Sequence, residues 1–223
     1  MPRRKHPQLS APEVMSYLEK DYGTPKWELR YDPTFELIYT ILSQHTSDIN
    51  SERAFKSLVR KFKTVEAISN AEEGEIEIAI RMGGLSKIKA PRIKRVLNQI
   101  YAELKSFDLW FLKEMPMNEA KDWLKNLPGI GPKTAAIILC FSLGMPAMPV
   151  DTHIFRVSKR LGLIGKKVNA DAAHDILEPM VNPHDVFAFH MQLIQHGRTI
   201  CKAIKPKCES CVISERCPSS ENN

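Results

Sequence analysis

The sequence predicts an all-α fold, and three observations support this prediction. Apolar residues recur at helical spacing along most of the 223 residues, whereas the alternating pattern of strands is scarce. Ser, Asp and Asn repeatedly precede these periodic stretches, as they do at the N-terminal ends of helices. Gly and Pro separate the stretches, most clearly at 144–149, where we expect a domain crossing.

Helix-start signals divide the first part of the chain into three helices. A capping box at 10–13 opens a short helix, and Asp32 opens the next one, with Pro in its first turn. Residues 44–48 interrupt that second helix. Either Ser47 or Asp48 can cap a third helix, because both side chains can accept a hydrogen bond from a free backbone N–H.

Two more helices are predicted on either side of a glycine turn. A Glu-rich helix covers 71–82, Gly83 and Gly84 form the turn, and a long amphipathic helix covers 93–104. The polar face of the long helix carries three basic residues that we expect to be solvated, namely Arg92, Lys94 and Arg95.

The helical pattern continues to the end of the chain. After a linking segment at 110–116, Asn118 is expected to cap a helix that leads to a glycine turn. The helix after that turn is almost wholly apolar, so it should be buried, with Cys140 as a core residue. Later helices should start at Asp151, Asn169 and Pro183, and the polar tail at 219–223 should fray.

The stretch at 127–135 predicts a sharp turn between two helices. Gly129 and Gly131 allow a close backbone approach, and Pro132 suits the first position of a helix. The free N–H groups of Gly129–Gly131, including that of Ile130, and the positive helix end predict a phosphate site. Lys133 lies in the first turn, where a cation is unfavourable, which indicates a chemical role.

Charge and hydropathy limit the function classes. The 32 Lys and Arg residues exceed the 26 Asp and Glu residues, and the net charge of +6 is compatible with a nucleic-acid partner. No apolar run approaches the roughly 18 residues that span a bilayer, and the basic start at 1–6 lacks the apolar segment of a secretory signal. We therefore expect a cytoplasmic protein with no membrane partner.

Four cysteines near the C-terminus have the spacing of metal ligands. Cys201, Cys208, Cys211 and Cys217 form the pattern C-x6-C-x2-C-x5-C within one loop. Zinc sites usually have two C-x2-C pairs with a longer spacer, and one such pair is present here. The spacing favours an iron–sulfur cluster over zinc, which stays the alternative, and over disulfides, which are rare inside cells.

Three motifs together resemble endonuclease III, a DNA glycosylase of the helix-hairpin-helix superfamily. They are Leu-Pro-Gly-Ile-Gly-Pro-Lys-Thr-Ala at 127–135, Val-Asp-Thr-His-Ile-Phe-Arg-Val at 150–157, and the cysteine loop at 201–217. The likeness extends from about residue 27 to residue 217, and the cysteine spacing matches the [4Fe–4S] loop of that family.

The resemblance implies two helical domains with a DNA-binding cleft between them. One domain would be a helical barrel at 27–141 that ends in the helix-hairpin-helix motif. The other would join 1–26 to 142–223 and hold the [4Fe–4S] cluster. A monomer would bind double-stranded DNA that contains damaged bases or abasic sites.

The resemblance also implies the chemistry. The enzyme would flip an oxidised pyrimidine out of the duplex, excise it and cleave the strand at the abasic site. Lys133 carries over as the nucleophile that forms a Schiff base, and Asp151 as the catalytic carboxylate. The reaction needs a neutral amine, and we expect desolvation and the positive helix end to favour that form. Asp151 is also expected to cap the helix that follows it.

Further residues carry over as DNA contacts. Leu85 matches a wedge that enters the base stack, and His45 stands where endonuclease III typically has a gap-filling Gln. This departure puts the opposite-base preference in question, and the adjacent Gln44 can share the role. Three lysines in the cluster loop are expected to contact the DNA backbone, namely Lys202, Lys205 and Lys207.

Three other positions match the family without a clear role. Asp48 matches a carboxylate beside the base pocket, although capping explains it equally well. His153 and His190 fall where the family has His, and we assign neither a function because lone helical histidines are usually structural.

Two alternative functions stay open. A monofunctional adenine or thymine mismatch glycosylase would share the fold, but those relatives generally lack a Lys at the position of Lys133. A non-enzymatic DNA-binding module with a zinc-bound cysteine loop would explain the glycines and the charge. It would leave the pairing of Lys133 with Asp151 without a purpose.

Overall fold

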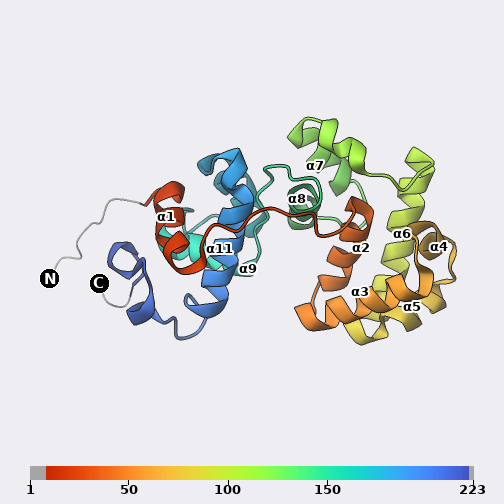
Figure 1. Cartoon of the computed structure of the whole chain (residues 1–223), viewed down its shortest axis with the longest axis horizontal. Helices are drawn as coiled ribbons and strands as arrows, with labels where there is room; N and C mark the ends of the chain where they lie inside the picture. Colours follow the sequence, from red (N-terminus) through yellow and green to blue (C-terminus); the bar gives the residue numbers. More distant parts are fainter. Residues whose placement is uncertain (1–8, 221–223) are drawn as a thin grey trace. The chain divides into compact units, whose positions relative to one another are not determined.

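The computed structural model describes residues 9–220 and confirms the all-α prediction (Figure 1). Within these residues there are eleven α-helices and six short 3₁₀ helices, and no strand. The basic start at 1–6 and the end of the polar tail at 221–223 lie outside the described residues. No helix in the described range is long and apolar enough to cross a bilayer.

The chain folds as two compact units. The central unit comprises 29–145, and the terminal unit joins 1–28 to 146–223. The extended segment at 144–150, which contains Gly144, Pro146 and Pro149, includes the boundary between them.

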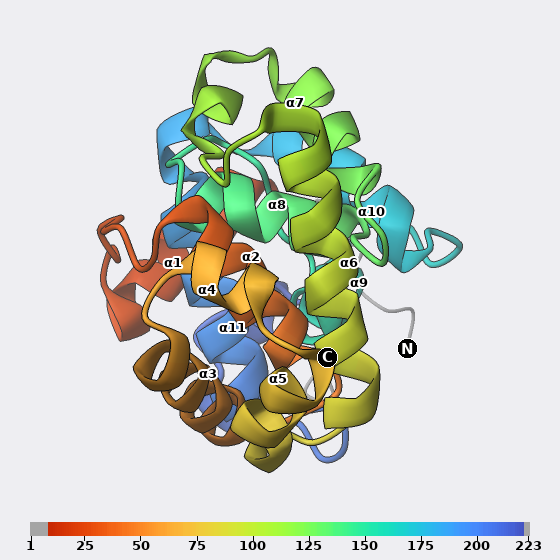
Figure 2. The ribbon, with the colours of Figure 1, turned by 90° about the vertical axis from the view of Figure 1, so that its right-hand side faces the viewer.

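Seven α-helices build the central unit. They are α2 (Pro33–Ser43), α3 (Asp48–Phe62), α4 (Val65–Asn70), α5 (Glu73–Ile80), α6 (Ser86–Leu104), α7 (Met117–Lys125) and α8 (Pro132–Phe141). Helix α2 packs on α3 and α8, and α7 packs on α8. Helix α6 runs beside α5 and α4 (Figure 2), and buries its apolar stripe from Ile93 to Ile100 as the spacing predicts.

Four α-helices build the described part of the terminal unit, residues 9–28 and 146–220. They are α1 (Ala11–Tyr22), α9 (Thr152–Leu161), α10 (Ala170–Leu177) and α11 (Val186–Thr199). Helix α11 packs on both α9 and α1 around the fully buried Phe189. Ile213, from the cysteine loop, joins the same core with 1% of its surface exposed, so this core supports the loop.

Local start signals are confirmed at most helices. Ser10 and Glu13 form the predicted capping box, and Asp32 caps α2. Ser47 is the cap of α3, so Asp48 is its first helical residue. The prediction for Asn118 is wrong: α7 begins at Met117, and Pro116 is its N-cap residue, without a side-chain hydrogen bond. Asn118 therefore lies inside the first turn, where it cannot be the cap.

The expectation of a solvated basic face on α6 is wrong for two of its three residues. Lys94 Nζ donates to the carbonyl oxygens of Ser69 and Ala71 at 3.0 and 2.6 Å, at the end of α4. Arg92 is half-buried and donates to the Gln44 side chain, whereas Arg95 is exposed. Long aliphatic stems let these cations reach unpaired oxygens at helix ends.

Candidate active site

The hairpin between α7 and α8 presents two free amides. Gly129 adopts φ +77°, and Gly131 caps α8 with an extended conformation. The amides of these two glycines donate to no acceptor within residues 9–220. The prediction for Ile130 is wrong in one respect, because its N–H donates to the Leu127 carbonyl at 3.1 Å. Ile130 instead anchors the turn, with 5% of its surface exposed.

Gly129 should tolerate no side chain. An added Cβ would lie 3.0 Å from Arg92 Nε, and the new residue would have to adopt the left-handed φ of +77° that glycine has here. We expect Gly129→Ala to lower the free energy of unfolding by about 1–2 kcal/mol. The matched control is Gly74→Ala in α5, where a Cβ meets nothing within 4 Å. Urea unfolding should show the control unchanged or up to about 1 kcal/mol more stable; an equal loss in both variants would contradict the argument.

Lys133 occupies the first turn of α8, in the central unit, as predicted. Its side chain is exposed, whereas Thr134, which follows it, is 6% exposed. The free chain therefore does not provide the expected desolvation, because this side chain is exposed. A bound ligand would have to supply it.

Asp151 caps α9 in the terminal unit, as predicted. Its Oδ1 accepts a hydrogen bond from the N–H of Ile154 at 2.8 Å, and the side chain is half-buried. The cap uses one carboxylate oxygen, so the second oxygen is available for chemistry.

His45 and Leu85 share an unusual backbone conformation. Each has φ of 54°, in the left-handed region that non-glycine residues seldom adopt. His45 lies in the loop between α2 and α3, and Leu85 directly precedes α6. Both side chains are exposed, Leu85 by 48%, so Leu85 is not a packing anchor. Two loop tips of the central unit therefore present a ring and an aliphatic group to solvent.

Gln44 is turned inward, unlike its neighbour His45. Its Oε1 accepts a hydrogen bond from Arg92 at 2.6 Å, and its Nε2 lies 3.5 Å from Thr134 Oγ1. These contacts connect the end of α2 to α6 and α8. In the described structure the Gln44 side chain therefore holds the loop between α2 and α3 against α6 and α8.

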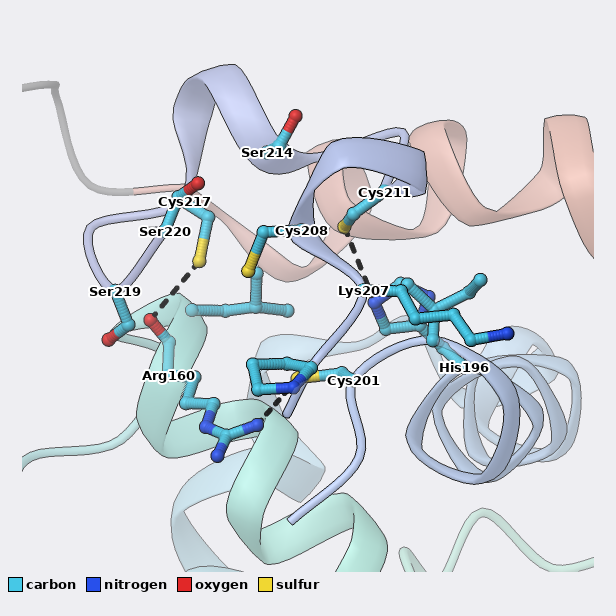
Figure 3. A pocket seen from close by; sticks show the side chains of 13 residues that line it. Arg160, His196, Cys201, Lys207, Cys208, Cys211, Ser214, Cys217, Ser219 and Ser220 are labelled. Atoms are coloured by element: carbon cyan, nitrogen blue, oxygen red, sulfur yellow. Dashed lines mark hydrogen bonds between the residues drawn. The ribbon is translucent and has the colours of Figure 1, made fainter. Parts of the chain in front are cut away.

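The four predicted ligands surround one pocket in the terminal unit (Figure 3). Cys201 follows α11, Cys208 begins a 3₁₀ turn at Cys208–Ser210, and Cys211 follows it. Cys217 follows a second 3₁₀ turn at Ser214–Arg216. The pocket that they line together with other residues has an empty volume of about 400 Å³, which includes open solvent, and none of the four thiols forms a disulfide.

The four thiols line the same pocket, so the charge of each affects the others. The pKa of the Cys211 thiol is raised mainly by burial, and further by the charges of the other three cysteines. Burial likewise raises the pKa of Cys217, with contributions from Cys201 and Cys208. Four mutually repelling thiolates in one pocket need a positively charged centre. The ligand set and its convergence fit an iron–sulfur cluster.

Two residues beside the cysteines were not predicted. Arg160 donates to Cys201 Sγ at 3.4 Å and to the Lys202 carbonyl at 2.7 Å. His196 Nε2 lies 3.6 Å from Cys211 Sγ, and burial lowers the His196 pKa to about 4. Arg160 lies 41 residues from Cys201 along the chain, so no local motif could have identified it.

The predicted lysines of the cysteine loop and the two helical histidines all lie in the terminal unit. Lys202, Lys205 and Lys207 are exposed on the cysteine loop, as a backbone-binding surface requires. His190 is 3% exposed with Nδ1 2.9 Å from the Pro149 carbonyl, and His153 Nδ1 lies 3.2 Å from Arg156. Both histidines thus have structural partners.

Family models match most of the chain. A model described as HhH-GPD superfamily base excision DNA repair protein matches residues 38–183. A model described as the iron–sulfur binding domain of endonuclease III matches residues 201–217, which confirms the prediction of an iron–sulfur site over zinc.

Relatives of known family match most of the chain. Endonuclease III of Rickettsia felis is 35% identical over 206 residues, which are 92% of this chain and 92% of the relative. Endonuclease III of Thermotoga maritima is 32% identical over 197 residues, 86% of each chain. These identities and coverages confirm the resemblance based on three motifs.

Solved structures share the fold. A trapped endonuclease III–DNA covalent intermediate has a TM-score of 0.80 at 28% identity, covering 95% of this chain and 97% of that one. A thermostable thymine-DNA glycosylase has a TM-score of 0.78 at 24% identity, covering 96% and 97%, a likeness of fold alone. The chain belongs to the endonuclease III family of HhH-GPD base excision DNA repair proteins.

Proposed function

We propose that this glycosylase removes oxidised pyrimidines from duplex DNA and then cleaves the strand at the abasic site, with Lys133 as nucleophile. Family membership makes the chain a base excision repair DNA glycosylase and lyase. The observation that carries the proposal is the exposed Lys133 in the first turn of α8, directly after two glycine amides without acceptors.

The hairpin would hold the DNA strand. The free amides of Gly129 and Gly131 and the positive end of α8 suit a phosphate, and they recognise the backbone rather than the sequence. The damaged base cannot be reached in the stack, so it must be extruded at a cost of a few kcal/mol. A damaged pair stacks less well, which lowers that cost and favours the lesion.

The exposed amine would then attack. Lys133 Nζ bonds to C1′ of the deoxyribose, and the base leaves with the electrons of its glycosidic bond and takes up a proton. Nζ then loses a proton. The C1′–O4′ bond breaks, O4′ keeps the bonding electrons and takes up a proton, and C1′ and Nζ form the double bond of a Schiff base. The bound duplex would desolvate Lys133, which the free chain leaves in water.

The Schiff base would drive strand cleavage. It acidifies the C2′ proton, whose removal forms the C2′–C3′ double bond and expels the 3′ phosphate with the electrons of its bond to C3′. Water then hydrolyses the imine and restores the amine. We assign to Asp151 the stabilisation of positive charge on the sugar and the transfer of protons to and from Lys133.

The iron–sulfur cluster has a supporting role in this proposal. The four cysteines would saturate its iron sites, so it offers no open position for substrate water. When bound, it supplies the cross-link that shapes the loop carrying Lys202, Lys205 and Lys207. A single chain would contact duplex DNA through this loop and the hairpin, without a second copy.

The test is borohydride trapping on a panel of single-lesion duplexes. We expect a covalent adduct and strand cleavage with thymine glycol and dihydrouracil, and neither with the undamaged duplex of the same sequence. Excision at adenine or thymine mismatches without an adduct would favour a monofunctional mismatch glycosylase. Absence of an adduct on every lesion and on abasic sites would overturn the proposal.

A further inference from the structure

Lys89 is a buried cation without an acidic partner. It lies on α6 with 3% of its surface exposed, and no carboxylate pairs with it within residues 9–220. Its Nζ donates to the Leu42 carbonyl at 2.6 Å and to the Gly83 carbonyl at 3.3 Å. Burial lowers the Lys89 pKa, and the charge of Arg92 lowers it further. An ammonium is costly to bury, so this arrangement requires a reason.

The two carbonyls lie where the chain enters the two loops that present His45 and Leu85. Leu42 is in the last turn of α2, three residues before His45. Gly83 ends the 3₁₀ turn Arg81–Gly83, two residues before Leu85. Such carbonyls lack partners within their own helices, and a cation suits the negative ends. One ammonium therefore joins the bases of two exposed loop tips.

Arg92 extends the same arrangement by one turn of α6. Its guanidinium donates to Gln44 Oε1 at 2.6 Å, next to His45. Its Nε would lie 3.0 Å from a Cβ added at Gly129, so the Arg92 side chain is next to the hairpin turn. Two cations on one helix thus lie beside all three segments of the central unit that we expect to meet DNA.

We propose that Lys89 is a positioning residue, whose ammonium fixes the spacing between His45 and Leu85 on the two sides of an extruded base. The inference rests on the proposed function, because this spacing matters only if the chain flips a base. A hydrophobic side chain of similar length would stabilise the same site at least as well. A buried ammonium differs from a hydrophobic side chain because its two hydrogen bonds hold the Leu42 and Gly83 carbonyls, and so the two loops, at a fixed distance from each other.

The matched control is on the same helix. Lys94 also donates to two carbonyls, those of Ser69 and Ala71 at 3.0 and 2.6 Å. These oxygens lie at the end of α4, in a segment that carries no proposed DNA contact. Lys94→Met therefore removes the same type of contact from the same helix without touching either loop.

The experiment compares two substrates with the full-length, cluster-loaded enzyme. Excision of thymine glycol from a duplex requires base extrusion, whereas borohydride trapping on a single-stranded abasic oligonucleotide does not. We expect Lys89→Met to slow duplex excision about tenfold or more, as small misplacements do, and to leave single-strand trapping within about twofold. Lys94→Met should leave the ratio of the two rates unchanged.

Other outcomes distinguish the inference from the function on which it rests. If the wild-type enzyme neither excises thymine glycol from the duplex nor forms an adduct with the abasic oligonucleotide, the proposed function fails. If wild type reacts but Lys89→Met keeps the wild-type ratio, or Lys94→Met shifts it equally, the positioning role is overturned. Should Lys89→Met fail to fold, Lys89→Gln replaces it, because the shorter Gln amide can reach one of the two carbonyls. An unchanged ratio of the two rates in Lys89→Gln would likewise overturn the positioning role.

Discussion

Lys133→Gln should abolish strand cleavage at abasic sites, with a rate loss of about 10³-fold or more. Gln keeps a similar length but cannot form a Schiff base, so the covalent route closes. Because Lys133 is exposed in the first turn of α8, the substitution removes no core packing. Single-turnover cleavage and borohydride trapping would measure the loss, and unfolding curves should match wild type.

Asp151→Asn is the matched variant for this prediction. Asn retains a side-chain oxygen that can accept from the Ile154 N–H, so the cap of α9 should persist. Loss of the negative charge should slow base excision by about 10²–10⁴-fold while some adduct still accumulates. Comparing the two variants thus distinguishes the role of Lys133 as nucleophile from the electrostatic role of Asp151. An adduct with Lys133→Gln at the wild-type rate would exclude Lys133 as nucleophile.

Features that depend on neighbours in sequence were predictable. Ser10 caps its helix through Glu13, three residues away, and Asp151 caps α9 through Ile154 in the same way. The glycine turn before Pro132 likewise starts α8 where the local pattern places it. The iron–sulfur binding segment at 201–217 was also identifiable, because the cysteine spacing is itself the signal.

Features that depend on distant contacts were not predictable. Lys89 and Arg92 lie on a helix whose pattern indicates a solvated polar face, but they meet carbonyl and amide oxygens more than forty residues away. Which cation reaches such an oxygen depends on how α6 crosses α2. The hydrogen bond from Ile130 to Leu127 shows the same limit on a smaller scale, because glycine positions alone do not determine which amides stay free.

Removing one cluster ligand should affect the terminal unit. The cysteine loop contains two three-residue 3₁₀ turns, Cys208–Ser210 and Ser214–Arg216, which give it little structure of its own. In Cys211→Ser the cluster loses a thiolate, so we expect loss of visible absorbance and bound iron. By analogy with a covalent cross-link over a loop of about 15 residues, the free energy of unfolding should fall by on the order of 3 kcal/mol.

The control for this prediction is a buried cysteine outside the loop. Cys140 lies in α8 with 1% of its surface exposed, so Cys140→Ala should cost about 1 kcal/mol and keep the full iron content. Trapping on single-stranded abasic DNA tests what the cluster does for activity. Because Lys133 lies in the central unit and the loop lysines in the terminal unit, Cys211→Ser should weaken DNA binding more than it slows the bound reaction. Full iron content in Cys211→Ser would remove this cysteine from the ligand set.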